Sequence, residues 1–146
     1  MTTRFRAEDI KRMMEHLRTM GAPFGITFAD RPLLSNSRLA LQAAEFARDH
    51  GRFGAFHPAL LSAYFSQGLD IGNIEILGPI AQEAGLDPDA MISAVHAGTY
   101  LPKLEAAKEE AALRGVSGVP TFFINEKKSI VGAQPIDAFR KAIRSA

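Results

Sequence analysis

Side chains that could carry out chemistry are few in this sequence, and they stand far apart. The 146-residue chain has no cysteine, which excludes a disulfide, a thiolate nucleophile and a cysteine metal site. No two histidines have the spacing that would place them as ligands on one turn of a helix. We therefore predict no metal site and no cofactor. The histidines are His16, His50, His57 and His96.

Neighbouring acidic residues and serines also give no catalytic group. Two of the acidic pairs lie at predicted helix starts, where the helix dipole stabilises negative charge, and the third is expected on a solvated face. No serine has a visible partnership with a histidine and an aspartate. We assign no catalytic residue. The acidic pairs are Glu8 and Asp9, Asp87 and Asp89, and Glu109 and Glu110.

Composition fits one ordinary globular domain. Apolar residues make up 47 % of the chain, and 17 basic residues nearly balance 16 acidic ones. Because the basic residues are scattered, nothing favours nucleic acid as a partner. The N-terminus has no apolar run, and no segment approaches the roughly 20 apolar residues that span a bilayer. We therefore expect no membrane association and a cytoplasmic location.

Apolar periodicity predicts about seven helices before and after a short β region. Gly78-Pro79 lies inside one of them, and we expect a kink or a late helix start there, because an internal proline loses a hydrogen bond. His57 is expected to cap the helix in which Pro58 occupies the first turn. The predicted helices are 7–20, about 35–50, one from Pro58 to Gly68, one from Asn73 to before Gly85, one from Asp87-Pro88 to Gly98, 99–114, and one opened by Gln134-Pro135.

Two short β-prone runs near the C-terminus predict a hairpin. Thr121–Ile124 and Ser129–Val131 are the strands, joined by a turn over Asn125–Lys128. Successive residues of a strand point to opposite faces, so Phe122 and Phe123 predict a sheet that is covered on both sides. The phenylalanines most simply form the core: Phe46, Phe53, Phe56, Phe65, Phe122, Phe123 and Phe139.

Several of these segments resemble the DsbA-like thioredoxin-fold family and, more narrowly, its FrnE branch. The most specific pair is Gly115-Val-Ser-Gly-Val-Pro-Thr-Phe-Phe-Ile-Asn followed by Val131-Gly-Ala-Gln-Pro. The resemblance continues upstream in Asn36–Ala47, Phe56–Phe65 and Ile80–Asp87, and therefore covers about Pro23 to the C-terminus. It implies membership of a protein-disulfide oxidoreductase family.

The chain departs from the family pattern at its N-terminal side. Family members carry a Cys-x-x-Cys pair at the start of a helix that follows a strand, and a further strand precedes the helical insertion. Here the sequence begins with the 7–20 helix, and we expect that the redox segment is missing. The fold class expected is α+β and mostly helical: a helical insertion over 7–114 and a β-hairpin and helix over 115–146, in one truncated domain without its N-terminal βαβ part.

A proline loop carries the only site that the resemblance implies. Val119, Pro120 and Thr121 match the loop in which a cis proline faces the redox pair, and the residue before it pairs with extended peptide or glutathione. Alternatively, Pro120 only sets the turn into the strand. We expect no redox activity from this chain alone. Three roles stay open: a peptide- or glutathione-binding module, a structural remnant, and a fragment completed by another polypeptide.

The strand edge suggests a partner as well. A hairpin alone is marginal in water, and an apolar open edge at Thr121–Ile124 invites pairing with another chain. We therefore expect a homodimer formed through this edge and through uncovered apolar helix faces.

Overall fold

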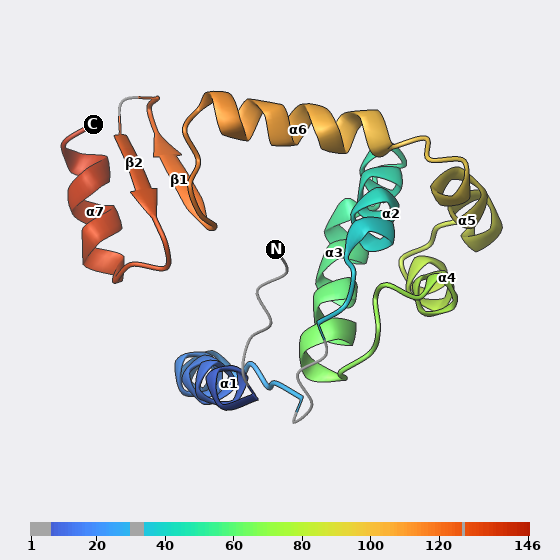
Figure 1. Cartoon of the computed structure of the whole chain (residues 1–146), viewed down its shortest axis with the longest axis horizontal. Coiled ribbons are helices and arrows are strands. Elements are labelled where there is room, and N and C mark those ends of the chain that lie inside the picture. The colour runs from blue at the N-terminus through green and yellow to red at the C-terminus, as the bar shows by residue number, and fades with distance from the viewer. Residues whose placement is uncertain (1–6, 30–33, 127) are drawn as a thin grey trace. The chain divides into compact units, whose positions relative to one another are not determined.

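The computed structural model describes residues 7–29, 34–126 and 128–146 and contains two compact units, Met1–Pro102 and Lys103–Ala146. Figure 1 shows their elements, and the mostly helical α+β class agrees with the sequence prediction. The elements are α1 (Ala7–Gly21), η1 (Ala22–Phe24), α2 (Arg38–Asp49), α3 (Phe53–Leu61), the π-helical turn η2 (Ser62–Ser66), α4 (Ile74–Glu83), α5 (Pro88–His96), α6 (Leu101–Leu113), β1 (Thr121–Ile124), β2 (Lys128–Val131) and α7 (Ile136–Arg144). Within the described residues, none of these helices is long and apolar enough to cross a membrane.

The core of the first unit lies among α2, α3, α4 and α5, which pack against one another (Figure 1). Phe56 of α3, Leu77 of α4 and Met91 of α5 are its largest fully buried side chains. Alanines line α2 on the same side, so the neighbouring helices approach closely. Burying each large apolar side chain contributes roughly 1.5–3 kcal/mol, and this cluster therefore holds the helical unit together.

Side-chain caps set the starts of α4 and α5. The Asn73 side chain accepts a hydrogen bond from the Glu75 N–H, as its position before an apolar run predicts. The Asp87 carboxylate accepts from the N–H groups of Asp89 and Ala90, and Pro88 occupies the first helical position. Both helices therefore begin where the sequence indicates.

The prediction that a helix begins at Pro58 is wrong. Helix α3 begins at Phe53, so Pro58 lies in its interior, and His57 does not cap it but stacks on Phe53 with ring centroids 4.8 Å apart. The helix nevertheless buries Phe56 completely. Burial of Phe56 outweighs the energetic cost of a proline inside the helix. The turn that follows, η2, is π-helical.

Of the two alternatives expected at Gly78-Pro79, a kink or a late helix start, the late start is wrong. Helix α4 runs from Ile74 to Glu83 with Pro79 inside it, because the Asn73 cap begins the helix well before the proline. Leu77, Gly78, Ile80 and Ala81 are all buried. Packing of this face against α5 therefore keeps the helix continuous.

The second unit contains an antiparallel hairpin and helix α7. Strands β1 and β2 form a two-stranded sheet in the register Thr121↔Val131, Phe122↔Ile130, Phe123↔Ser129 and Ile124↔Lys128, so β2 begins one residue before the predicted strand. Phe139 of α7 packs edge-on against Phe122 at 4.9 Å, and the Arg114 guanidinium lies 5.3 Å from the Phe123 ring. The two strand phenylalanines thus point to opposite faces.

No described residue of the second unit is buried. Phe122 and Phe123 remain 43 % and 40 % exposed, while Ile136 and Ile143 of α7 remain 63 % and 62 % exposed. The interpretation of Phe122 and Phe123 as core is therefore wrong, and Phe65 of η2 is exposed as well. For Phe122 and Phe123 the reason is geometric, since two short strands are too narrow to cover their own side chains.

Candidate functional site

The loop from Gly118 to Thr121 is held on two sides. The Thr121 hydroxyl donates to the Gly118 carbonyl at 2.6 Å, and the Gly132 N–H donates to the Pro120 carbonyl at 2.7 Å. The Val119–Pro120 peptide bond is cis. These contacts bring the three predicted site residues together at the start of β1.

Val119 projects from this loop. Its side chain is 89 % exposed, and within the described residues its backbone N–H and C=O have no hydrogen-bond partner. The loop can therefore offer one backbone donor and one acceptor to an extended ligand. The Thr121 hydroxyl is already engaged with Gly118, so it is not a free nucleophile.

Strand β1 continues this set of backbone groups along the edge of the sheet. The Gly132 to Pro120 hydrogen bond fixes the phase of the antiparallel ladder, so Phe122 and Ile124 direct their backbone groups toward β2. Thr121 and Phe123 therefore direct theirs away from β2. Because β1 pairs only with β2 in the described sheet, this outer edge is open.

An apolar pocket of about 670 Å³ lies in the first unit. Ser66 Oγ donates to the Thr27 carbonyl and the Ala29 N–H donates to the Phe65 carbonyl, which fixes the segment after η1 against η2. Among the residues that the structure describes, no charged side chain lines the pocket. Sequence reasoning missed it, because its walls come from three segments without a shared motif: Leu17, Gly25, Ile26, Thr27, Phe28, Pro58, Leu61, Ser62, Phe65 and Ser66.

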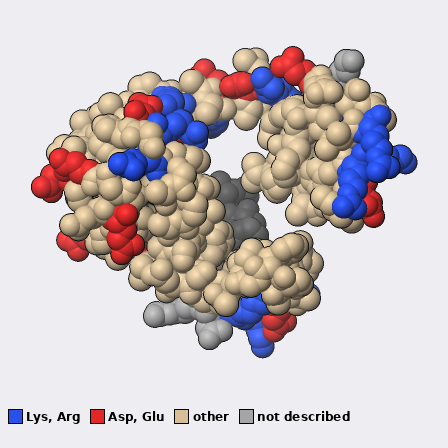
Figure 2. Space-filling view, turned by 180° about the vertical axis from the view of Figure 1, so that it is seen from behind, with Lys and Arg blue, Asp and Glu red and all other residues tan. Residues whose placement is uncertain are grey.

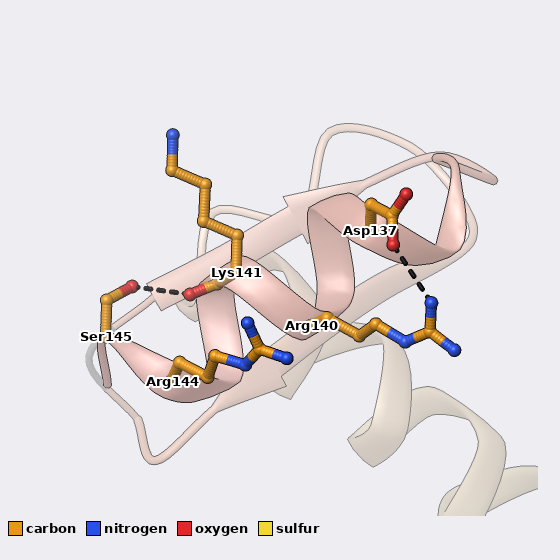
Figure 3. Close-up of a pocket in the computed structure, with 5 residues that line it drawn as sticks. All are labelled: Asp137, Arg140, Lys141, Arg144 and Ser145. Atoms are coloured by element: carbon orange, nitrogen blue, oxygen red, sulfur yellow. Dashed lines mark hydrogen bonds and ion pairs between the residues drawn. The ribbon is translucent and has the colours of Figure 1, made fainter.

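Basic side chains gather on one face of the second unit (Figure 2), where a depression of about 590 Å³ follows helix α7. Figure 3 shows its lining: Arg140 pairs with Asp137 at 3.0 Å, and Ser145 Oγ donates to the Lys141 carbonyl at 2.8 Å. Arg144 completes the group. All these side chains are exposed, so the depression is an open cationic surface and not an enclosed site.

The histidines and acidic pairs take structural positions. His50 stacks on Phe46 at 4.0 Å, and His96 ends α5. Glu110 pairs with Arg114 at 3.0 Å on exposed α6. Over residues 7–29, 34–126 and 128–146, no group of three or more potential ligands from histidine, aspartate and glutamate gathers in a way that could hold a metal ion.

In the first unit, the carboxyl group of Asp70 has a lowered pKa. The neighbouring Ser35 hydroxyl and the hydrogen bond from the Gly72 N–H lower the pKa of Asp70 below its usual value. The Gly72 bond is 2.9 Å long and closes the turn before α4. The group is fully exposed, so the effect belongs to local turn structure.

Comparison with known families identifies the fold. The family model described as "DSBA-like thioredoxin domain" matches residues 2–144. The chain belongs to this family. It is a member without cysteine, in agreement with the resemblance seen in the proline-loop motif.

Similar proteins include one from Bacillus subtilis (strain 168), the uncharacterized protein YwbO, which is 35 % identical over 109 residues. The match covers 72 % of this chain and 52 % of YwbO, so the chain spans about half the length of this curated relative. YwbO is itself uncharacterized, so its similarity to this chain supports family membership and indicates no activity.

Two solved structures share the fold. The probable DsbA oxidoreductase SCO1869 from Streptomyces coelicolor aligns with a TM-score of 0.82 and 26 % identity, over 97 % of this chain and 62 % of that one. A candidate protein disulfide isomerase from Nitrosomonas europaea aligns with a TM-score of 0.75 and 15 % identity, over 99 % of this chain and 76 % of that one. The second likeness shows the fold alone.

Proposed function

We propose that this chain is a non-redox DsbA-like module that binds an extended peptide through the Val119–Thr121 loop. The observation that carries the proposal is the exposed Val119, whose backbone donor and acceptor have no hydrogen-bond partner among the described residues, beside the fixed Pro120. An extended peptide can satisfy both groups by adding one short β-bridge. Glutathione, itself a short peptide, is the alternative ligand for the same groups.

The absence of cysteine supports the non-redox part of the proposal. Thiol–disulfide exchange requires attack by a thiolate, and the chain has none. A thiol-exchange assay with the purified chain should show the uncatalysed rate. Clear turnover that follows the protein through purification would contradict this part.

The motifs support a narrower placement as well. We assign the chain to the FrnE branch from the pairing of Gly118-Val-Pro-Thr-Phe with Val131-Gly-Ala-Gln-Pro. We also propose that the chain corresponds to the helical insertion and the ββα end of the family fold, because it spans 62 % of the SCO1869 chain. Intact mass of the native protein tests this: a mass well above that of the 146 residues would identify a longer polypeptide.

The peptide-binding proposal is tested by following amide resonances during titration. We expect an extended peptide or reduced glutathione to shift the Val119 and Thr121 amides selectively. Because the recognition uses backbone groups, Val119→Ala should retain the shift at Thr121, whereas Val119→Pro, which has no N–H at that position, should lose it. Equal loss in both variants, or no selective shift in the unmodified chain, would contradict the proposal.

A further inference from the structure

We infer that a pocket between η2 and α4, in the first unit, binds a small organic cation, a primary ammonium group carried on a short hydrocarbon chain. The pocket has a volume of about 310 Å³. Small-molecule sites usually measure about 300–1,000 Å³, so this one suits a small ligand. Every residue that lines it lies between Ala59 and Glu83, and one continuous stretch of this chain therefore supplies all of its walls.

The floor of the pocket is apolar and belongs to the packed part of the unit. Ala63 and Ile80 are buried, and Leu69 and Ile76 are half-buried against the same core. Helices α3 and α4 pack against each other (Figure 1), which holds this floor in place. A short hydrocarbon chain laid on it leaves water, and each methylene group that does so favours binding.

The π-helical turn η2 brings two polar side chains to this pocket. The Gln67 N–H donates to the Ser62 carbonyl at 3.0 Å, across five positions of the chain. Such a turn places residues five apart one above the other, whereas the 3.6-residue turn of an α-helix would put them on different sides. Ser62 and Gln67 both line the pocket, and among the described residues neither side chain has a hydrogen-bond partner.

Glu83 supplies the negative charge. Of the described residues, it is the only charged one that lines the pocket, and it has no ion-pair partner among them. It is the last residue of α4, where the negative end of the helix dipole disfavours a carboxylate. Arg52 lies beside Gly85 near the same helix end but does not line the pocket. A bound cation is therefore favoured both by the carboxylate and by the dipole.

The polar groups of the pocket match an ammonium ion. An ammonium group has three donors and no acceptor, and the Glu83 carboxylate, the Gln67 carbonyl and the Ser62 hydroxyl can all accept. An anionic ligand would meet the Glu83 charge without a compensating cation. A lysine side chain ends in the same group, so a free amine and a lysine of a peptide are two sources of one ligand chemistry.

Titration of the full chain with n-butylammonium, followed by amide resonances, tests the binding. We expect saturable shifts at Gln67, Leu69 and Glu83. Because Glu83 is exposed, its charge should make butylammonium bind about two- to fivefold more tightly than 1-butanol, which has the same hydrocarbon chain without the charge. Equal affinities for the two ligands, or no saturable shift at these amides, overturns the inference.

A lysine with a blocked backbone, N-acetyl-lysine amide, separates the two sources. Tighter binding of this compound than of butylammonium supports the inference with a peptide lysine as the ligand, and weaker binding supports it with a free amine. The Val119 amide should stay unshifted with both compounds. The inference therefore does not depend on peptide binding at the proline loop, which that amide reports separately.

Two glutamates of α4 provide a matched pair of variants. Glu83→Gln should weaken the binding of butylammonium about two- to fivefold and leave the affinity for 1-butanol unchanged. Glu75→Gln removes the same charge from the same helix at an exposed position outside the pocket, and should leave both affinities unchanged. Equal effects of the two variants on butylammonium would trace the attraction to net charge and overturn the inference.

Filling the pocket tests its shape without changing a charge. Ala59 is half-buried in α3 and lines the pocket, so Ala59→Leu should abolish saturable binding. Ala55→Leu adds the same side chain at an exposed position of the same helix and should leave binding unchanged. Circular dichroism checks that both variants keep their helices, and the Glu83→Gln comparison does not rely on either. Binding retained in a folded Ala59→Leu variant overturns the inference.

Discussion

The two units of this chain differ in how much of their apolar surface they bury. The helices α2–α5 enclose Phe56, Leu77 and Met91 completely, whereas no described residue of the second unit is buried. Both units contain large apolar side chains, such as Phe56 in the first and Phe122 in the second, so the presence of these residues alone does not cause the difference. It arises because four helices can surround a core by themselves, while a two-stranded hairpin has one helix beside it and an open edge.

Because of this difference, the two units contribute differently to the stability of the folded chain and to its exposed surface. The helical unit supplies the burial that keeps the chain folded, and the hairpin unit leaves backbone groups and apolar side chains exposed. The proline loop and the β1 edge both lie in the second unit. The predictions below test the contrast, beginning with the largest expected effect.

Truncation of equivalent aliphatic side chains should separate the units most clearly. Leu77→Ala should lower the free energy of unfolding by about 3 kcal/mol, because it removes a fully buried side chain and leaves a cavity. Ile143→Ala, at a position that is 62 % exposed, should cost less than about 0.5 kcal/mol. Urea denaturation of both variants measures the difference, and similar costs would remove the contrast.

Helix caps in the first unit give the next effect. Asp87→Ala should lower the free energy of unfolding by about 1 kcal/mol, because the Asp89 and Ala90 N–H groups lose their acceptor. Asp87→Asn keeps an acceptor and should cost much less. Ser37→Ala is the control at the start of α2, where the serine side chain makes no capping hydrogen bond. A cost at Ser37 equal to that at Asp87 would show that the capping bonds are not responsible.

Acid should weaken the turn before α4 through Asp70. Its pKa is lowered in the folded chain, so this carboxylate contributes stability above its unfolded pKa of about 3.9. The contribution is lost as pH falls through the lower, folded pKa. In Asp70→Asn, thermal stability should therefore decline less between about pH 4 and pH 2 than in the unmodified chain. If the thermal stability of both proteins fell equally over this pH range, groups other than Asp70 would be responsible for the acid sensitivity.

Sequence predicted most of the fold because local signals and packing agree there. Asn73 and Asp87 mark helix starts through their own side-chain hydrogen bonds, and Thr121–Ile124 is β-prone on its own. The helix around Pro58 was mispredicted because its start depends on burial of Phe56, which no local signal records. The preference of proline for the first turn of a helix therefore placed the start of this helix too late.

The candidate site was predictable only in part. The motif around Pro120 located the loop, but the exposure of Val119 and the phase of the β1 edge depend on the Gly132 to Pro120 hydrogen bond. Exposure of Phe122 and Phe123 was mispredicted because hydrophobicity does not reveal how many strands a sheet will have. The apolar pocket of the first unit has no sequence signature at all.

Hydrogen exchange at the amides of β1 tests the central contrast most directly. In dilute solution, the account predicts slow exchange at Leu77 and Met91 in the helical core and fast exchange at Thr121 and Phe123, whose N–H groups point outward. Protection of Thr121 and Phe123 as strong as that of Leu77 and Met91 would contradict the contrast between a closed helical core and an open strand edge.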